Sequence, residues 1–124
     1  RSYWIATTCP DGRPHSLPVW GLWLDDALWF STSRRSVKAR NLANDPRCAA
    51  HLESADEVVV LSGTAGIEDD PGALEPFLDA YEAKYALRPD LEGLDAAVYV
   101  VTPSTTLSWR EHDYPQTAVR WVHA

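Results

Sequence analysis

The sequence of 124 residues contains no methionine, only two cysteines and only two phenylalanines. Cys9 and Cys48 lack the spacing of a metal or redox motif, which argues against a structural zinc site and against a disulfide scaffold. The four histidines lie far apart, so no metal ligand set is predicted. No apolar run reaches the length of a membrane span. These absences favour a globular protein of the reducing cytoplasm. Because methionine is missing, we also expect a trimmed chain that lacks an upstream helix.

Positive charge is scarce as well. Eleven Lys and Arg stand against eighteen Asp and Glu, which gives a net charge of −7. Nucleic-acid binding is therefore not expected, because a basic face supplies most of its affinity. The charges are unevenly distributed: five of the eleven basic residues lie between positions 34 and 47, and twelve of the eighteen acidic residues lie between 53 and 95. The chain thus keeps one local basic segment, suited to a small anion.

This basic segment directly follows an apolar run, Leu28-Trp29-Phe30, which predicts a buried strand. Residues 31–38 then bring hydroxyl and cationic side chains to the start of a helix predicted over 37–44. A helix N-terminus offers unpaired N–H groups and the positive end of the helix dipole. A phosphate-binding cradle is therefore predicted here, built from Arg34, Arg35, Ser36 and Lys38. The alternative is a solvated helix start with ordinary surface arginines, because the glycines of a P-loop or a Rossmann turn are missing.

The rest of the chain predicts mainly strands. Strands are expected at 3–8, 15–24, 27–32, 47–53, 57–67, 96–107 and 117–122, and helices at 37–44 and 71–86. Short turns join the first three strands into an antiparallel meander. Pro18 indicates an edge or a bulge in the second strand, and Gly63 and Gly66 indicate bulges in the fifth. Weak alternation predicts strands covered on both faces. We therefore expect one mainly β domain over residues 1–124, a six- to seven-stranded antiparallel barrel with two peripheral helices or a sheet covered by a second subunit.

Tryptophan is abundant, with six residues in the chain. Core and dimer packing is the ordinary role of such a large side chain. Trp20 and Trp29 are the best exceptions, because they are expected on neighbouring strands that meet at the predicted cradle. A flat ring between these side chains, with its phosphate in the cradle, has the outline of a nucleotide-like cofactor.

Several fragments, in this order, carry a resemblance to a known family: Ala6-Thr-Thr-Cys-Pro-Asp-Gly-Arg-Pro-His15, Pro18-Val-Trp20, Leu28-Trp-Phe-Ser-Thr32, Ser36-Val-Lys-Ala-Arg-Asn-Leu42 and Asp45-Pro46. They resemble the pyridoxamine 5′-phosphate oxidase-like proteins, FMN-binding split β-barrels that include the flavin/deazaflavin oxidoreductases. The resemblance runs from about residue 3 to 66 and is weaker at Trp109 and at 117–121. It implies a split β-barrel and a homodimer with two cofactor sites at the subunit interface.

The resemblance also implies roles for individual residues. Pro18, Val19 and Trp20 would lie along the flavin ring, and Trp29, Phe30, Ser31 and Thr32 beside the ring and the ribityl chain. Ser36, Val37 and Lys38 match the Ser-Arg-Lys that binds phosphate in the oxidases, with Val37 in place of the arginine and Arg34 or Arg35 as the compensating charge. Asn41 matches a position near that site. Strand five, with Val60 and Ser62, would approach the cofactor from the partner subunit.

The basic C-terminal motif that holds the substrate phosphate in true pyridoxamine phosphate oxidases is not found, which disfavours vitamin B6 oxidation. The expected function is a flavin- or deazaflavin-dependent oxidoreductase that transfers a hydride to or from a small conjugated substrate. FMN is the expected cofactor, and the deazaflavin coenzyme F-420 is the alternative. No catalytic side chain is assigned, because the flavin carries the hydride chemistry. Two other readings remain: a non-catalytic binder of flavin or a related planar ligand such as haem, and a structural all-β dimer with a vestigial site.

Overall fold

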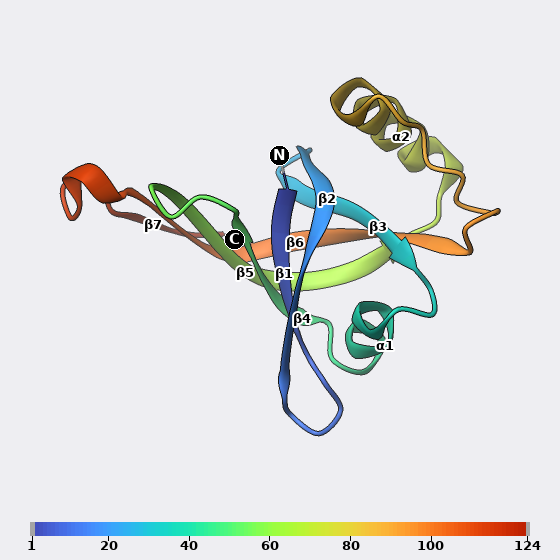
Figure 1. The fold of residues 1–124 in the computed structure, drawn as a ribbon, viewed down its shortest axis with the longest axis horizontal. Helices are drawn as coiled ribbons and strands as arrows, with labels where there is room; N and C mark the ends of the chain where they lie inside the picture. Colours follow the sequence, from blue (N-terminus) through green and yellow to red (C-terminus); the bar gives the residue numbers. More distant parts are fainter. Residues whose placement is uncertain (1, 124) are drawn as a thin grey trace.

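The strands of the molecule form one antiparallel sheet that closes on itself (Figure 1). The computed structural model describes residues 2–123. The elements are β1 (Ser2–Thr8), β2 (Pro14–Leu24), β3 (Ala27–Ser33), α1 (Val37–Asn44), β4 (Arg47–Leu52), β5 (Glu57–Glu68), α2 (Pro71–Tyr85), β6 (Ala96–Arg110), the short 3-10 helix η1 (Glu111–Asp113) and β7 (Val119–Val122). The strand order is β3-β2-β1-β4-β5-β6-β7, and β3 also pairs with β6. Six strands thus close a barrel and β7 is an extra strand, which confirms the mainly β fold with two helices.

Strand β6 changes its neighbour along its length. Its residues 96–101 pair with β3, and its residues 105–108 pair with β7, while β5 runs beside most of it. The β5–β6 register shifts between Ser62 and Gly63, where a Cβ on Gly63 would collide with the backbone of β6. The bulge predicted at Gly66 is wrong, because Gly66 pairs in register with Val100. The start of β5 and the end of β6, which pair with each other, project from the barrel as an arm together with β7 and η1 (Figure 1).

Strand β2 is divided between two partners. Its first part, residues 14–20, pairs with β1, and its last part, residues 21–24, pairs with β3. Pro18 therefore has a strand on one side only, as expected for a residue that lacks an N–H donor. The turn to β3 is tight, because Asp25 and Asp26 both have positive φ angles of 52° and 59°, the combination found in two-residue hairpins. Beyond the short β2–β3 ladder, the first part of β2 and the end of β3 are no longer paired with each other.

Two apolar cores explain the weak alternation of the sequence. The first core fills the barrel with residues such as Ile5, Leu28 and Phe30, and α1 contributes Ala39 and Leu42 to it. The second core lies on the outer face of β2, β3 and β6 beneath α2 and contains Leu22, Ala27, Trp29, Phe77, Tyr81, Tyr85 and Val98. Successive residues of β3 therefore point into different cores, and both of its faces are buried.

Local signals begin and end the helices. The Ser36 hydroxyl accepts a hydrogen bond from the Ala39 N–H at 3.1 Å and caps α1. The helix ends at Asn44, before the sequence Asp45-Pro46. Asp70 caps α2, with Pro71 in the first turn. The cradle predicted from the sequence is therefore placed at a capped helix start that directly follows β3.

Candidate functional site

The Ser36 hydroxyl is the centre of the site at the β3–α1 junction. It accepts hydrogen bonds from the Thr32 hydroxyl at 3.2 Å and from the Ala39 N–H at 3.1 Å. The Ser36 N–H donates to the Ser33 carbonyl at 3.0 Å, which fixes the backbone of the turn. A serine hydroxyl has two acceptor lone pairs and one proton. Because both lone pairs are engaged, the Ser36 proton is left to donate to a further group.

Backbone donors lie next to this hydroxyl. Among residues 2–123, the N–H groups of Val37 and Lys38 find no hydrogen-bond acceptor. The first turn of α1 also contains no acidic side chain, so nothing in that turn neutralises the positive end of the helix dipole. Two N–H groups and one hydroxyl proton are thus available at one helix start, which is the donor set that binds an oxyanion.

Lys38 adds a cation whose environment is unusual. Its side chain is partly buried, and this burial lowers the pKa of the ammonium group below its ordinary value. Lys38 forms no ion pair with any residue in the range 2–123. A partly buried cation without a counter-ion is costly, and an anion at the start of α1 would remove that cost.

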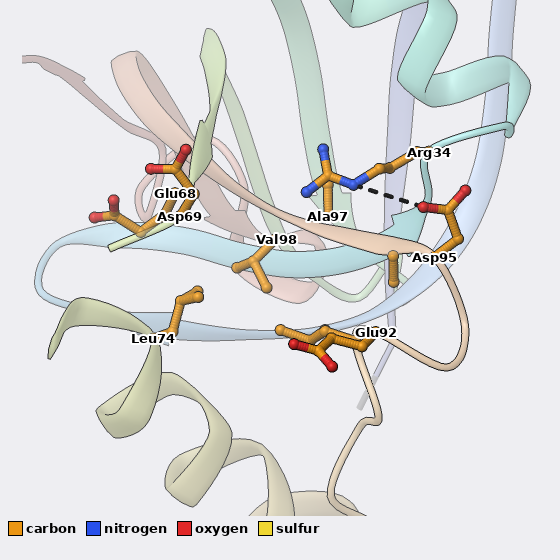
Figure 2. A pocket seen from close by; sticks show the side chains of 10 residues that line it. Arg34, Glu68, Asp69, Leu74, Glu92, Asp95, Ala97 and Val98 are labelled. Atoms are coloured by element: carbon orange, nitrogen blue, oxygen red, sulfur yellow. Dashed lines mark ion pairs between the residues drawn. The ribbon is translucent and has the colours of Figure 1, made fainter. Parts of the chain in front are cut away.

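Arg34 and Arg35 are arranged differently. The Nε atom of Arg34 lies 3.9 Å from Oδ1 of Asp95, and the Nε atom of Arg35 lies 3.5 Å from Oδ2 of the same carboxylate. Figure 2 shows Arg34 reaching into a cavity of about 450 Å³ whose rim also carries Glu68, Asp69 and Glu92. Both arginines of the predicted cradle therefore have a carboxylate beside them, whereas Lys38 has none within the described residues.

Asn41 is largely buried, although it lines a cavity of about 380 Å³ together with Val37 and Arg40 of the same helix. It is 2% exposed, and its Nδ2 donates to Oγ1 of Thr7 at 3.0 Å and to Sγ of Cys9 at 3.7 Å. The side chain thereby joins α1 to the end of β1. Cys9 and Cys48 are both free thiols, and burial raises the pKa of Cys48 to about 11. The contribution of Asn41 is to hold α1, and with it the cradle, against the barrel.

The two tryptophans expected to flank a ring have different surroundings. Trp20 is 42% exposed, and its indole stacks on Tyr85 of α2 with ring centres 4.8 Å apart and planes at 7°. Trp29 is 6% exposed, stacks on Phe77 at 5.7 Å, and donates from Nε1 to the Leu24 carbonyl at 2.9 Å. Both lie on the side of the sheet that α2 covers. The Trp29 indole is enclosed there, so of these two tryptophans it is Trp20 that offers an aromatic surface to a ligand.

The other residues predicted to contact the cofactor differ in how far their side chains are exposed. Pro18 is exposed and Val19 is buried on the part of β2 that has lost β3 as a partner. Phe30 is fully buried in the barrel and stacks on Tyr99 at 5.4 Å. Ser31 and Thr32 are partly exposed at the end of β3. The Phe30 position can therefore contact a ligand only through its backbone, whereas the two hydroxyl residues can use their side chains.

Val60 and Ser62 are not brought to the cradle of their own chain. Val60 pairs with Leu107 and Ser62 with Thr105, in the half of β6 that has already left β3. The Ser62 carbonyl accepts a hydrogen bond from the Ser104 hydroxyl at 3.0 Å. Val60 lines a separate cavity of about 560 Å³ that Trp109 also lines. In a single chain, these two residues and the start of α1 are therefore different regions.

Sequence reasoning missed the contact of α2 with β2. Tyr85 lies within the helix predicted at 71–86, but nothing in the sequence links it to Trp20, 65 residues away. The pairing of Asp95 with the two arginines is equally long-range.

No helix within residues 2–123 is long and apolar enough to cross a membrane. Across the same residues, no three His, Cys, Asp or Glu side chains are grouped so that they could hold a metal ion.

Solved structures resemble this fold over most of the chain. A conserved hypothetical protein from Mycobacterium tuberculosis, Rv2991, is 28% identical, with a TM-score of 0.75 over 89% of this chain and 77% of that one. A haem-binding protein from Mycobacterium smegmatis is 25% identical, with a TM-score of 0.72 over 98% of this chain and 52% of that one. An F-420 reductase is 24% identical, with a TM-score of 0.67 over 85% of this chain and 87% of that one, a likeness of fold.

A comparison with curated proteins found no match. A family model does match, and it covers residues 1–110 of the 124 under the description pyridoxamine 5′-phosphate oxidase. The match includes the whole barrel with all of β6, and the cradle, in agreement with the resemblance of the sequence fragments. The chain therefore belongs to the pyridoxamine 5′-phosphate oxidase family, the split β-barrel proteins.

Proposed function

We propose that the protein is an oxidoreductase that uses FMN to transfer a hydride to or from a small conjugated substrate. The observation that carries this proposal is the start of α1, where two N–H groups, the Ser36 proton and the Lys38 ammonium group have no acceptor or counter-ion within residues 2–123. These groups fit a phosphate in charge and in hydrogen-bonding capacity. In this proposal residues 1–124 act as a single cofactor-binding domain in the cytoplasm.

The ring would lie along the first part of β2. An unpaired strand edge presents N–H and C=O groups, which match the donors and acceptors along the edge of a flavin ring. Residues 14–20 have such an edge, because β3 does not pair with them. Pro18, Val19 and Trp20 would contact the ring there, with Ser31 and Thr32 beside the ribityl chain. Val19, Trp29 and Phe30 would contribute backbone contacts, since their side chains are buried.

When bound, the flavin supplies the hydride chemistry, and the residues of the chain bind and orient it. Ser36 and Lys38 would hold the phosphate. The polar groups at the end of β3 would fix the chain between phosphate and ring. Exclusion of water from the ring requires a cover that a single chain does not provide around the exposed Trp20.

A second copy of the chain would supply that cover. Large apolar side chains are exposed on β1 and on the β6–β7 arm: Trp4, Leu107, Val119, Trp121 and Val122, between 36% and 74%. Exposed apolar surface of this kind is typical of an interface. In the proposed homodimer, Val60 and Ser62 would reach the cofactor of the other subunit, which accounts for their distance from the cradle of their own chain.

FMN is favoured over the deazaflavin coenzyme F-420 by the charges at the cradle. Arg34 and Arg35 already share Asp95, so one partly buried lysine and a helix start remain for one phosphate. The longer anion of F-420 would need further cations. Arg40 of α1 is one such cation near the cradle, because it is exposed and forms no ion pair with residues 2–123. The F-420 reductase among the structural neighbours keeps this cofactor as the alternative.

The test is the absorption spectrum of the purified protein, with the released ligand identified by mass. We expect FMN, either bound as purified or retained after it is added, and turnover when NAD(P)H or another hydride donor is supplied with an acceptor. A protein that takes up neither FMN nor F-420 contradicts the proposal. Release of haem, or a bound flavin that no donor and acceptor pair can turn over, would favour a non-catalytic binder, a role supported by the haem-binding neighbour.

A further inference from the structure

The last turn of α2 forms two hydrogen bonds with one backbone carbonyl of strand β2. The Tyr85 hydroxyl donates to the Gly21 carbonyl at 2.6 Å, and the Lys84 ammonium group donates to the same oxygen at 2.7 Å. The Lys84 Nζ atom also lies 4.9 Å from the centre of the Tyr3 ring. A carbonyl oxygen accepts two hydrogen bonds at most, so this one is fully used. The end of α2 is thus fastened to β2 at the residue that directly follows Trp20.

The same tyrosine also contacts the Trp20 side chain. Its ring packs against the indole with centres 4.8 Å apart and planes only 7° from parallel. Gly21 is closely packed against β3, because a Cβ there would lie 2.9 Å from the Trp29 carbonyl oxygen. Backbone and side chain of the Trp20–Gly21 pair are therefore held from the same residue of α2, while 42% of the indole remains exposed.

We propose that Tyr85 is a positioning residue of the cofactor site, which holds the Trp20 indole in the orientation that receives the planar ring. The inference rests on the proposed function, since it needs a ligand ring beside β2. Tyr85 does not touch the ligand in this arrangement. It acts through Trp20, and its effect is specific to the ring half of the ligand, because the phosphate half is held at α1 by a different part of the fold.

Tyr81 provides a matched control. Tyr81 and Tyr85 lie one helical turn apart on α2, both belong to the core beneath that helix, and both are 7% exposed. Their rings contact each other at 4.7 Å, but the contact with Trp20 is made by Tyr85. Leucine at either position therefore removes a similar amount of buried aromatic packing, and only the change at 85 removes the ring that stacks on the Trp20 indole.

The experiment compares the wild type with Tyr85→Leu, Tyr85→Phe and Tyr81→Leu. Dissociation constants are measured for FMN and for inorganic phosphate, the ringless probe, together with the visible circular dichroism of bound FMN. We expect Tyr85→Leu to weaken the affinity for FMN about tenfold and to leave the affinity for phosphate unchanged. It should also alter the visible circular dichroism of the bound FMN ring. Tyr85→Phe should keep the wild-type spectrum, because the stacking ring is retained. Tyr81→Leu should resemble the wild type in both affinities. Tyr85→Met, which fills the space without a flat ring, replaces the leucine variant if that variant does not fold.

Three results would overturn the inference. Equal loss of FMN affinity in Tyr85→Leu and Tyr81→Leu would mean that α2 packing in general is responsible. Equal loss of FMN and phosphate affinity in Tyr85→Leu would mean that the change acts through the cradle or the whole fold. Unchanged FMN affinity and dichroism in Tyr85→Leu, with normal binding by the wild type, would show that the indole needs no support. A wild-type protein that binds neither FMN nor F-420 instead refutes the proposed function itself, and the positioning role with it.

Discussion

Lys38 and the Arg34–Arg35 pair are close in the sequence and carry the same charge, but the fold treats them in opposite ways. The arginines are exposed and share the Asp95 carboxylate at 3.9 Å and 3.5 Å. The lysine is partly buried and has no counter-ion among residues 2–123. Proximity to a helix start therefore does not by itself make a cation part of an anion site. What matters is whether the protein itself has already supplied the opposite charge.

The largest expected effect separates these cations directly. Lys38→Ala should weaken FMN binding by about 1.5–3 kcal/mol, the scale of a hydrogen bond to a charged group, or roughly 10- to 150-fold. Arg35→Ala, the matched loss of one charge, should change the affinity by less than about threefold, because exposed and already paired charges contribute little. Titration of both variants with FMN measures the difference. Equal losses would remove the distinction between the two regions.

The pH dependence of binding should follow Lys38 as well. Burial lowers the pKa of the free lysine, and a bound phosphate would raise it again by favouring the charged form. The complex therefore holds the Lys38 proton more tightly than the free protein does. By linkage, FMN affinity falls as the pH rises through the lowered pKa of the free protein, before an ordinary lysine would titrate.

The control for this pH profile is Lys38→Arg, because a guanidinium group stays charged over the whole range. Dissociation constants are measured from pH 7 to 10 for both proteins. The arginine variant should lose the alkaline decline. The same decline in both proteins would assign the pH dependence to another group.

A smaller effect is expected for the hydroxyl at the start of α1. Ser36→Ala removes the cap of α1 and should lower the free energy of unfolding by about 1 kcal/mol. The substitution should also weaken the binding of FMN, since the Ser36 proton is one of the proposed hydrogen-bond donors to its phosphate. Ser33→Ala is the matched control, because Ser33 accepts from the Arg35 N–H at 3.1 Å on the arginine side of the junction. Chemical denaturation and FMN titration of both variants test whether the two serines differ as the cations do.

The smallest effect is expected at Asp95. Asp95→Asn removes the carboxylate shared by Arg34 and Arg35, so both positive charges become available to a nearby anion. FMN affinity should rise about two- to threefold at low ionic strength, and the gain should disappear near 1 M salt, where the Debye length is roughly 3 Å. Stability should change by less than about 1 kcal/mol, because the ion pairs are exposed. A large, salt-independent gain would show that the arginines belong to the same site as Lys38.

Local signals made much of the fold predictable. The bounds of α1 were predicted residue by residue, because Ser36 and Asp45-Pro46 mark its two ends without help from distant residues. The strands of the meander were predicted for the same reason, from Gly12 and the Asp25-Asp26 turn. β6, in contrast, continues three residues beyond the expected end at Leu107, because β5 pairs with it there. A strand end that depends on its partner cannot be found from its own residues.

The candidate site was predictable only in part. Ser36 is the N-cap and Lys38 the second residue of α1, so their sequence spacing alone places them at the helix start. The difference between Trp20 and Trp29 depends on α2, which follows more than 40 residues later and encloses one indole while stacking on the other. The ion pairing of Arg34 and Arg35 depends in the same way on Asp95. Contacts over such separations leave no pattern in a single sequence.

The helix that carries the cradle also closes the barrel, since Ala39 and Leu42 of α1 are part of the barrel core. The same helix therefore carries the phosphate-binding residues and covers the barrel core, and α1 cannot leave its place without exposing that core. Whatever binds at its first turn consequently acts on the whole folding equilibrium and raises the melting temperature with the logarithm of ligand concentration. Thermal melts at increasing FMN concentration would then report occupancy of the cradle without any assay of turnover.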